Sequence, residues 1–278
     1  EVEKFMLRSM YSGISGMRGF QTKLDVIGNN IANVNTAGFK SSRVSFSNML
    51  SQMMAGGTMP DEGTIGGVNP KQIGLGVTVS AIDTLHTPGS AMTTNVPTDL
   101  RIDGDGFFVV SRDGTEATAF LTRDGNFKVD ASGYLVNSAG MFVMSVGAGG
   151  PIQIDPEAYT AFYIAQDGSI MATDADGETA AIDQIGIARV VNPNGLEHVG
   201  GNLYRLTPIA DPNDIATITT FAGDGGRGQV IAGQLEMSNV DLTNEFTEMI
   251  VAQRGFQANS RIITTSDDIL QEVVNLKR

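Results

Sequence analysis

Apolar residues recur at alternating steps of four and three at both ends of the chain, and this pattern constrains the two ends to form long helices. Near the C-terminus the series comprises Leu242, Phe246, Met249, Gln253, Phe256, Ser260, Ile263, Asp267, Leu270 and Val274, of which seven are apolar. Near the N-terminus it comprises Leu7, Met10, Ile14, Met17, Gln21, Leu24, Gly28 and Ile31, of which six are apolar. Such spacing places a narrow apolar seam on one side of a helix, which is typical of helix-to-helix packing. We predict that the two ends pair as a coiled coil or bind other copies of the chain, with the apolar members of both series as the assembly interface.

The predicted helices cover residues 7–34 and 241–276, or roughly 42 and 54 Å at 1.5 Å per residue. Gly13, Gly16 and Gly19 lie at i, i+3 and i+6 in the first helix, where each costs about 0.5–1 kcal/mol relative to Ala. We interpret them as positions where a neighbouring backbone packs closely; the alternative is a weak, frayed helix start. The Asn-rich segment 29–40 is predicted to end this helix, because Asn side chains compete for backbone hydrogen bonds and Gly38 can adopt the left-handed conformation.

The long middle of the chain has the pattern of β-structure, so the predicted fold class is α+β. Residues 1–40 form the N-terminal helical segment and residues 41–95 a connector, with a short helical turn at 47–54 that turns Met49, Leu50 and Met53 inward, and a strand at 75–85. Residues 96–235 form a β-rich outer domain, and residues 236–278 the C-terminal helix. Within the β region, strands are expected at 106–110, 121–123, 126–129, 134–136, 159–165, 185–191, 202–206 and 229–237. Their spacing near ten residues suits a small sandwich or barrel.

Charge is distributed unevenly along the chain. The formal net charge is −13, with +3 on residues 1–50, −3 on residues 236–278 and the remaining −13 in between. Opposite charges favour association of the two ends, weakly and in a salt-dependent way. The acidic middle argues against nucleic acid as a partner, and its simplest interpretation is a solvated surface.

The composition also restricts redox chemistry and membrane insertion. The chain has no Cys, which excludes disulfides and thiol chemistry. It has no run of 18 apolar residues, so no membrane insertion is expected. The first five residues lack the features of a secretory signal, and Met6 is a plausible natural start, which would make Glu1–Phe5 a leader or an added segment.

Motifs for chemistry are weak. Residues 223–228 match G-x-G-x-x-G, but strand-like residues follow where a dinucleotide site needs a helix. Asp103–Gly106 and Asp174–Glu178 lack the full ligand set of a calcium loop. His86 and His198 have no nucleophile signature near them in the sequence. We therefore predict no catalytic residues, no cofactor, no metal and no enzymatic activity.

Several segments, taken together, resemble the bacterial flagellar rod and hook protein family. The matching segments are residues 11–17, 24–36, 38–40, 102–108, 122–125, 238–242 and 257–261, and the family-motif residues among them are Asn29, Asn30, Asn33, Asn35, Gly38, Phe39, Asn259 and Arg261. The resemblance covers nearly the whole chain. It implies a structural subunit that leaves the cell through the flagellar type III export apparatus. It also implies that the paired terminal helices line the inner tube of a helical homopolymer, with the β-rich middle as its outer layer.

Within that family, the resemblance points first to the hook, a curved and flexible tube that acts as a universal joint. Residues 26–30 and the Ser-rich stretch 40–46 look like hook proteins of Gram-positive bacteria, whereas the chain length is closer to that of the distal rod, a straight drive shaft. The expected location is the basal body and hook, extracellular after export. The implied partners are other copies and the axial proteins of the distal rod, hook cap and hook–filament junction. A secreted binding module whose helices merely oligomerise is the remaining alternative.

Overall fold

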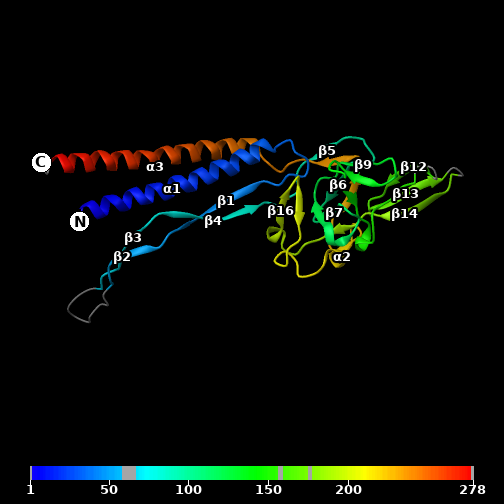
Figure 1. Ribbon diagram of the computed structural model, residues 1–278, viewed down its shortest axis with the longest axis horizontal. Coiled ribbons are helices and arrows are strands. Elements are labelled where there is room, and N and C mark those ends of the chain that lie inside the picture. The colour runs from blue at the N-terminus through cyan, green and yellow to red at the C-terminus, as the bar shows by residue number, and fades with distance from the viewer. Residues whose placement is uncertain (1, 58–66, 156–158, 175–176, 277–278) are drawn as a thin grey trace. The chain divides into compact units, whose positions relative to one another are not determined.

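The computed structural model describes residues 2–57, 67–155, 159–174 and 177–276, and its fold is α+β (Figure 1). A long helix begins the chain, a mainly-β region follows, and a second long helix ends it. The chain divides into two compact units. Unit 1 consists of residues 1–31, 42–83 and 241–278, and unit 2 consists of residues 32–41 and 84–240.

Unit 1 contains the two long helices, α1 (Val2–Ala32, 31 residues) and α3 (Leu242–Leu276, 35 residues). Both agree with the predicted helices, although α1 begins five residues before the predicted position 7. The side chains of residues 2–7 lie outside the described part, and so does the predicted interface side chain of Leu7. Within the described residues, neither helix has a stretch that is long and apolar enough to span a membrane.

Unit 1 also contains four strands in the segment that we expected to be mainly a connector. They are β1 (Ser42–Asn48), β2 (Ser51–Ala55), β3 (Lys71–Gly74) and β4 (Val77–Thr84), of which β1 pairs with β4 and β2 pairs antiparallel with β3. The predicted helical turn at 47–54 is wrong, because these residues end β1 and form β2. Leu50 and Met53 are 84% and 58% exposed, so they do not face inward as predicted.

Unit 2 is built almost entirely from short strands. Its strands are β5 (Ala91–Thr93), β6 (Leu100–Asp103), β7 (Phe107–Ser111), β8 (Ala119–Thr122), β9 (Phe127–Val129), β10 (Leu135–Asn137), β11 (Phe142–Val143), β12 (Tyr159–Ile164), β13 (Ser169–Asp174), β14 (Thr179–Gln184), β15 (Ile187–Ala188), β16 (Glu197–Gly200), β17 (Leu203–Arg205), β18 (Thr219–Thr220), β19 (Gln229–Ala232) and β20 (Gln234–Glu236). The one-turn helix α2 (Ile215–Ile218) interrupts them.

The strands of unit 2 form one large sheet and several small ones. The order in the nine-stranded sheet is β16-β17-β8-β7-β11-β10-β9, with β15 paired to β7 and β18 paired to β15. Strands β12, β13 and β14 form a separate antiparallel sheet, and β6 and β5 pair with β19 and β20. Sequence reasoning missed β13 and β14, and it predicted a longer strand than β15 at 185–191.

The core of unit 2 lies on both sides of β7. Phe108 and Val110 face one hydrophobic cluster, which includes Leu100 and Phe127. Phe107 and Val109 face another, which includes Leu121. Each buried Phe or Val contributes about 1.5–3 kcal/mol of hydrophobic stabilisation. Because both faces of β7 are covered, its sequence is a continuous apolar run instead of the alternation typical of a half-exposed strand.

Glycines at turns explain one further difference from expectation and one agreement with it. The predicted strand 229–237 is two strands, because Gly233, at φ +76°, separates β19 from β20 and each pairs with a different partner. The glycine-rich segment 223–228 is a turn before β19, with Gly223, Gly225 and Gly226 at positive φ. This agrees with the interpretation of that segment as a turn and not a nucleotide loop.

Candidate assembly surface and the buried ion cluster

The helices α1 and α3 lie antiparallel within unit 1, and glycines allow their close approach (Figure 1). A Cβ atom on Gly16 would lie 2.8 Å from Nδ2 of Asn259, and one on Gly13 would lie 3.4 Å from Cγ1 of Ile263. The glycine Gly255 of α3 makes a similar close contact with α1, since a Cβ there would lie 2.6 Å from the ring of Phe20. The distance at Gly13 is an ordinary van der Waals contact, whereas Cβ contacts as short as those at Gly16 and Gly255 are essentially never seen, so a larger residue at these two positions requires the neighbour to move.

Polar contacts join the same two helices. Ser9 and Ser266 share a hydrogen bond of 3.4 Å, and Nζ of Lys23 lies 2.5 Å from Oε2 of Glu248. Nδ2 of Asn30 donates to Oε1 of Glu245 at 3.0 Å. Burial raises the pKa of Glu245, and the bond from Asn30 opposes this shift.

The contacts define the line along which α1 meets its neighbour. On α1 the contacting or buried residues are Ser9, Gly13, Gly16, Phe20, Lys23, Ile27 and Asn30, again at steps of four and three. The spacing is the predicted one, but its phase differs by one residue from the predicted series Met10, Ile14, Met17, Leu24 and Ile31. Those five side chains are partly buried beside the contact line.

The α3 contact line includes three of the seven apolar residues predicted for this helix. Met249, Ile263 and Leu270 are partly buried, and Ala252 and Ser266 are buried. The predicted residues Leu242, Phe246, Phe256 and Val274 are 39%, 50%, 37% and 63% exposed. Small and polar residues, such as Ala252 and Asn259, stand at contact positions where we expected larger apolar ones.

Apolar residues beside the contact line leave α3 with an incompletely covered surface. Ile262 and Ile269, seven residues apart, are 43% and 50% exposed on one flank. Phe246 and Val274 belong to the heptad position on the other flank. Ile250 at 59% and Val251 at 54% are exposed as well. Contiguous exposed apolar surface on a folded chain marks a site of protein association.

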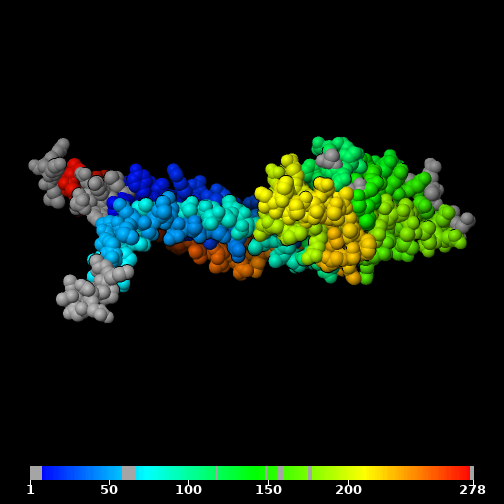
Figure 2. All heavy atoms as spheres, turned by 90° about the horizontal axis from the view of Figure 1, so that it is seen from below, coloured from blue at the N-terminus to red at the C-terminus, as the bar shows by residue number. Residues whose placement is uncertain are grey.

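Gly19 serves a different contact from Gly13 and Gly16. A Cβ at Gly19 would lie 2.9 Å from the ring of Phe46 in β1 and 3.8 Å from Val77 in β4. The backbone N–H of Val77 donates to Oγ of Ser15 at 3.3 Å. Strands β1 and β4 therefore cover one side of α1, as the light-blue and cyan surface along the helices shows (Figure 2).

The family-motif residue Asn30 anchors the beginning of β1 within unit 1. It is 1% exposed, its Nδ2 donates to the carbonyl of Ser42 at 2.9 Å, and its Oδ1 accepts from the N–H of Ser42 at 3.0 Å. Asn29 is exposed, as are Gly28 and the α3 motif residue Arg261, whose carbonyl accepts from Thr265. Asn30 thus joins the end of α1 to the beginning of β1 and to Glu245 of α3.

The rest of the N-terminal motif folds into unit 2. Asn33 accepts a hydrogen bond from Oγ1 of Thr36, and Asn35 is exposed. Gly38 adopts φ +69°, and a Cβ there would lie 2.6 Å from the backbone nitrogen of Asp124. Phe39 is 8% exposed. The glycine is required both by its left-handed conformation and by the neighbouring backbone.

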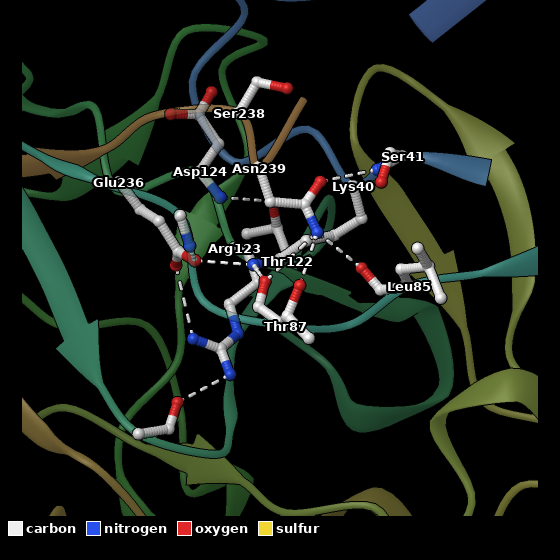
Figure 3. Close-up of polar contacts among 12 residues, drawn as sticks. Lys40, Ser41, Leu85, Thr87, Thr122, Arg123, Asp124, Glu236, Ser238 and Asn239 are labelled. Atoms are coloured by element: carbon white, nitrogen blue, oxygen red, sulfur yellow. Dashed lines mark hydrogen bonds and ion pairs between the residues drawn. The ribbon is translucent and has the colours of Figure 1, made fainter. Parts of the chain in front are cut away.

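A buried ion cluster follows this motif (Figure 3). Oε1 of Glu236 in β20 lies 2.5 Å from Nζ of Lys40, and its Oε2 lies 3.2 Å from Nη1 of Arg123. All three side chains are at most 3% exposed. The Gly89 N–H also donates to Glu236, and Lys40 donates to the carbonyl of Thr87 at 2.8 Å. Breaking a buried ion pair typically costs 3–5 kcal/mol, because it leaves an uncompensated charge.

The cluster shifts the pKa values of its members. Burial alone raises the pKa of Glu236, but the charges of Arg123 and Lys40 outweigh burial and hold that pKa below its ordinary value. Burial lowers the pKa of Lys40, and Glu236 offsets this only in part. The carboxylate of Glu236 is therefore the group that neutralises both buried cations.

Asn239 completes the connections around the cluster (Figure 3). Its Oδ1 accepts from the N–H of Ser41 at 2.8 Å, and its Nδ2 donates to the carbonyl of Leu85 at 2.8 Å and to Oγ1 of Thr87 at 2.9 Å. One side chain thus joins three chain segments at the edge of unit 2. The motif Ser238–Leu242 contained Asn239, but its role was not predicted. The sequence analysis also did not predict that Glu236 is buried. The one sequence signal for it is the position of this carboxylate beside the apolar Leu235 in a strand.

The described residues contain no group of three or more His, Asp or Glu side chains placed to hold a metal ion. The turns at Asp103–Gly106 and around Asp174 therefore carry no such cluster within the described ranges. The two units thus have different characters. Unit 2 is rich in β-strands and contains a buried ion cluster, and unit 1 is mainly helical and has exposed apolar residues on α3. This is the organisation expected of a structural subunit.

Comparison with known proteins agrees with that class. Residues 10–40 match the family described as "Flagella basal body rod protein", residues 101–172 match "Flagellar hook protein FlgE/F/G D1 domain", and residues 231–276 match "Flagellar basal body rod FlgEFG protein C-terminal". The flagellar basal-body rod protein FlgG of Bacillus subtilis (strain 168) is 55% identical over 273 residues, covering 98% of this chain and 100% of the relative. FlgG of Borreliella burgdorferi is 38% identical, with the same coverage. The flagellar hook protein FlgE of Treponema pallidum is 28% identical over 471 aligned positions, also at 98% and 100% coverage.

The chain belongs to the flagellar rod and hook protein family. It is a structural component of the flagellum, located in the basal body and hook, and its family is not one of enzymes.

Proposed function

We propose that this chain is a subunit of the distal rod, the straight drive shaft of the flagellum. The observation that carries this proposal is the 55% identity to a basal-body rod protein over the full length of both chains. The hook relatives are 28% identical over alignments of 471 and 446 positions, so they contain long segments without a counterpart among these 278 residues. The comparisons thus favour the rod alternative over the hook that the sequence features indicated.

In this proposal α1 and α3 pair as an antiparallel coiled coil and form the inner wall of a helical homopolymer. The four-three spacing of the contacts along α1 supports the coiled coil. Exposed apolar residues on both flanks of α3, such as Ile269 and Phe246, support contact with more than one neighbouring copy. Association of such surfaces is driven by removal of apolar area from water, at about 25 cal/mol per Å².

A groove in unit 1 supports further contact between copies. It has a volume of about 450 Å³ and is lined by residues of α1 and β4, including Ile14, Tyr11 and Val77. Tyr11 is 68% exposed, although large aromatic side chains are usually covered. In the proposed wall, an apolar side chain of another copy fills this groove.

Unit 2 forms the outer layer in the proposed rod. Torque passes along the tube because densely packed inner helices resist sliding. Subunits reach the growing tip through the flagellar type III export apparatus, and the rod contacts other axial proteins at its two ends. The hook remains the second candidate, and a fixed oligomer with a binding role is the third.

Substitution on α3 tests assembly, at Phe256, which is 37% exposed, or at Ile263, which lies against Gly13 of α1. Phe256→Asp or Ile263→Asp should abolish polymer formation, because each places a charge where the proposed wall excludes water. Unit 2 should stay folded, and tyrosine fluorescence reports this because four of the five tyrosines lie in unit 2. Asn275→Asp, on the exposed last turn of α3, is the matched control and should polymerise. Normal polymers from Phe256→Asp and Ile263→Asp would overturn the inner-wall assignment.

Electron microscopy of basal bodies from cells lacking the chain distinguishes rod from hook. A structure that ends within the rod is expected. A complete rod without a hook would instead assign the chain to the hook, and unchanged basal bodies would favour the binding module.

A further inference from the structure

Unit 2 contains a cavity with an unusual concentration of positive charge. The cavity has a volume of about 370 Å³, and its lining includes Arg123, Arg189, Arg227 and His86, with Asp105 as the acidic member. Unit 2 consists of residues 32–41 and 84–240, and the full sequence of these ranges carries 8 Lys/Arg against 19 Asp/Glu, a net charge of −11. Three of the eight cations of a strongly acidic unit therefore line one cavity.

Internal contacts satisfy the three guanidinium groups to different degrees. Arg227 donates to the carbonyls of Ile187, Ile218 and Asp224, so each of its three nitrogens makes one bond within the fold. Arg189 donates from Nη1 to the carbonyl of Gly225 at 2.7 Å. A guanidinium has five N–H donors, so Arg189 keeps donors for a further partner.

Arg123 supplies an independent sign of an unfilled site. It is 3% exposed, and two of its groups bond Glu236 and the carbonyl of Gly104. Its Nε–H has no acceptor among the described residues, and Nδ1 of His86 also lacks a hydrogen-bond partner there. Leaving a buried donor such as this Nε–H unsatisfied costs about 1–3 kcal/mol, so Arg123 lines the cavity without a full set of internal partners.

The positive charge of the cavity is not neutralised from within. Glu236 is already shared between Lys40 and Arg123. This leaves Asp105 against Arg189 and Arg227 among the lining residues. A planar guanidinium fork matches the two oxygens of a carboxylate in a bidentate geometry.

We propose that this cavity binds the carboxylate of an Asp or Glu side chain from a second copy of the chain. The inference rests on the proposed function, since a homopolymer brings acidic surfaces of neighbouring copies against each other. The anions that another copy can offer are carboxylates, and the chain has 31 Asp and Glu residues. The contact would fix the register between outer units while leaving the helical wall to supply most of the association energy.

A zero-length crosslink tests the contact in assembled polymers. In Arg189→Lys the new amine stands in the cavity, and a carbodiimide couples it to an adjacent carboxylate. The amide bond forms between Nζ and the carboxyl carbon, and the carbodiimide takes up the displaced oxygen as a urea. Polymers grown from equal parts of ¹⁴N- and ¹⁵N-labelled chains should yield mixed-isotope peptides that join position 189 to an Asp or Glu of another copy.

Arg205→Lys is the control for the coupling chemistry. Arg205 lies 3.5 Å from Glu197 of the same chain and is outside this cavity. It should therefore give a crosslink within one chain, without mixed isotopes. Coupling at 205 but no link between copies at 189 overturns the inference while the polymers themselves uphold the proposed function. Electron microscopy first shows whether the parent chain polymerises at all. If the parent chain does not polymerise, both the proposed function and the cavity contact are overturned.

Charge reversal supplies a second measurement. Arg189→Glu should raise the critical concentration for polymerisation about tenfold, the effect of losing one charge-assisted contact, while Arg205→Glu should change it less than about twofold. Equal effects at both positions would contradict a specific site.

Titration of the unassembled chain with acetate separates a neighbouring side chain from a free carboxylate. The chain has two histidines, so the ring signals of His86 can be followed by NMR. Burial first, then Lys40 and Arg123, lower the pKa of His86 to about 4, and a bound carboxylate would raise it. Saturation by millimolar acetate, without crosslinks between copies in polymers, would assign the cavity to a small free carboxylate and overturn the second-copy assignment.

Discussion

Each unit contains one close Lys–Glu ion pair, and the two pairs have the same Nζ–Oε distance of 2.5 Å. The side chains of Lys40 and Glu236 in unit 2 are 0% and 1% exposed, whereas those of Lys23 and Glu248 in unit 1 are 22% and 54% exposed. Distance alone does not set the contribution of an ion pair to stability. The buried pair is costly to break because its charges have lost water, whereas water screens the exposed pair.

The same contrast applies to the two units as wholes. Unit 2 buries both faces of β7 and encloses its ion cluster, so its fold is determined by contacts within the unit. Unit 1 joins its helices through glycines and small polar residues, and it leaves Phe246, Ile250 and Val274 at least 50% exposed. On α3 these exposed apolar residues recur along one helix, so unit 1 offers an extended helical surface to other molecules, whereas the exposed Val191 and Ile209 of unit 2 lie outside its strands. Substitutions in the two units should change different observables of the full chain.

The largest effect is expected from Glu236→Gln. The amide keeps the shape of the side chain but leaves Lys40 and Arg123 without a buried counter-charge, so the free energy of unfolding should fall by about 3–5 kcal/mol. Urea unfolding followed by tyrosine fluorescence measures this for unit 2, where Tyr134, Tyr159, Tyr163 and Tyr204 lie. A change below about 1 kcal/mol would show that the cluster is hydrated and equivalent to a surface pair.

Acidification should weaken unit 2 through His86. Its folded-state pKa is about 4, below the ordinary 6.5. The unfolded chain therefore binds a proton that the folded chain does not, and stability falls as the pH drops from about 6.5 to about 4. The loss is at most about 3 kcal/mol, at 1.36 kcal/mol per pKa unit. Protonation of Glu236, whose folded pKa is also lowered, adds a loss below its ordinary pKa.

The variant His86→Gln isolates the histidine contribution. Its free energy of unfolding should fall less than that of the parent chain between pH 6.5 and pH 4, when both are measured by urea unfolding. Packing of His86 against Phe107 and Tyr204, at ring distances of 5.8 and 5.7 Å, makes the variant less stable at pH 7. The comparison therefore uses the slope with pH, and parallel slopes for the two chains would contradict the assignment.

A smaller effect is expected from valine at two glycines of α1. Gly16→Val should push Asn259 away and weaken α1–α3 pairing by about 1–3 kcal/mol, the usual cost of overpacking. Gly28 has no atom within 4 Å of its Cβ position, so Gly28→Val should gain a few tenths of a kcal/mol from helix propensity. Circular dichroism at 222 nm during heating reports on unit 1, because α1 and α3 contain nearly all of the helical residues described. Equal melting of the two variants would mean that the glycines do not set the helix spacing.

The apolar periodicity of the two ends predicted the helices, and the strand pattern of the middle predicted the β region. Both predictions were possible because periodicity is a local property of the sequence. These patterns did not predict the contact phase on α1, because the predicted phase was set by the apolar series alone. Gly13 and Gly16 were predicted to pack closely but were not used to place the contact line, and Asn30 makes its contacts by donating hydrogen bonds. The ion cluster was also missed. Glu236 is 196 positions from Lys40 and 113 from Arg123, and no local pattern links them. The arginines of the cavity were missed for the same reason, since three separate loops bring them together.

The smallest effect is expected from Glu248→Gln, the exposed counterpart of the first substitution. Lys23 loses a partner but remains hydrated, so the free energy of unfolding should change by at most about 1 kcal/mol, and less at high salt. Dichroism at 222 nm, in low and in high salt, measures this in unit 1. If Glu248→Gln instead reduced stability as much as Glu236→Gln, then Lys23 and Glu248 would have to be shielded from water by a contact between copies. Repeating the measurement below the critical concentration for polymerisation would test this, because a shielded pair should lose its extra stability on dilution, whereas a pair that is strong within one chain should keep it.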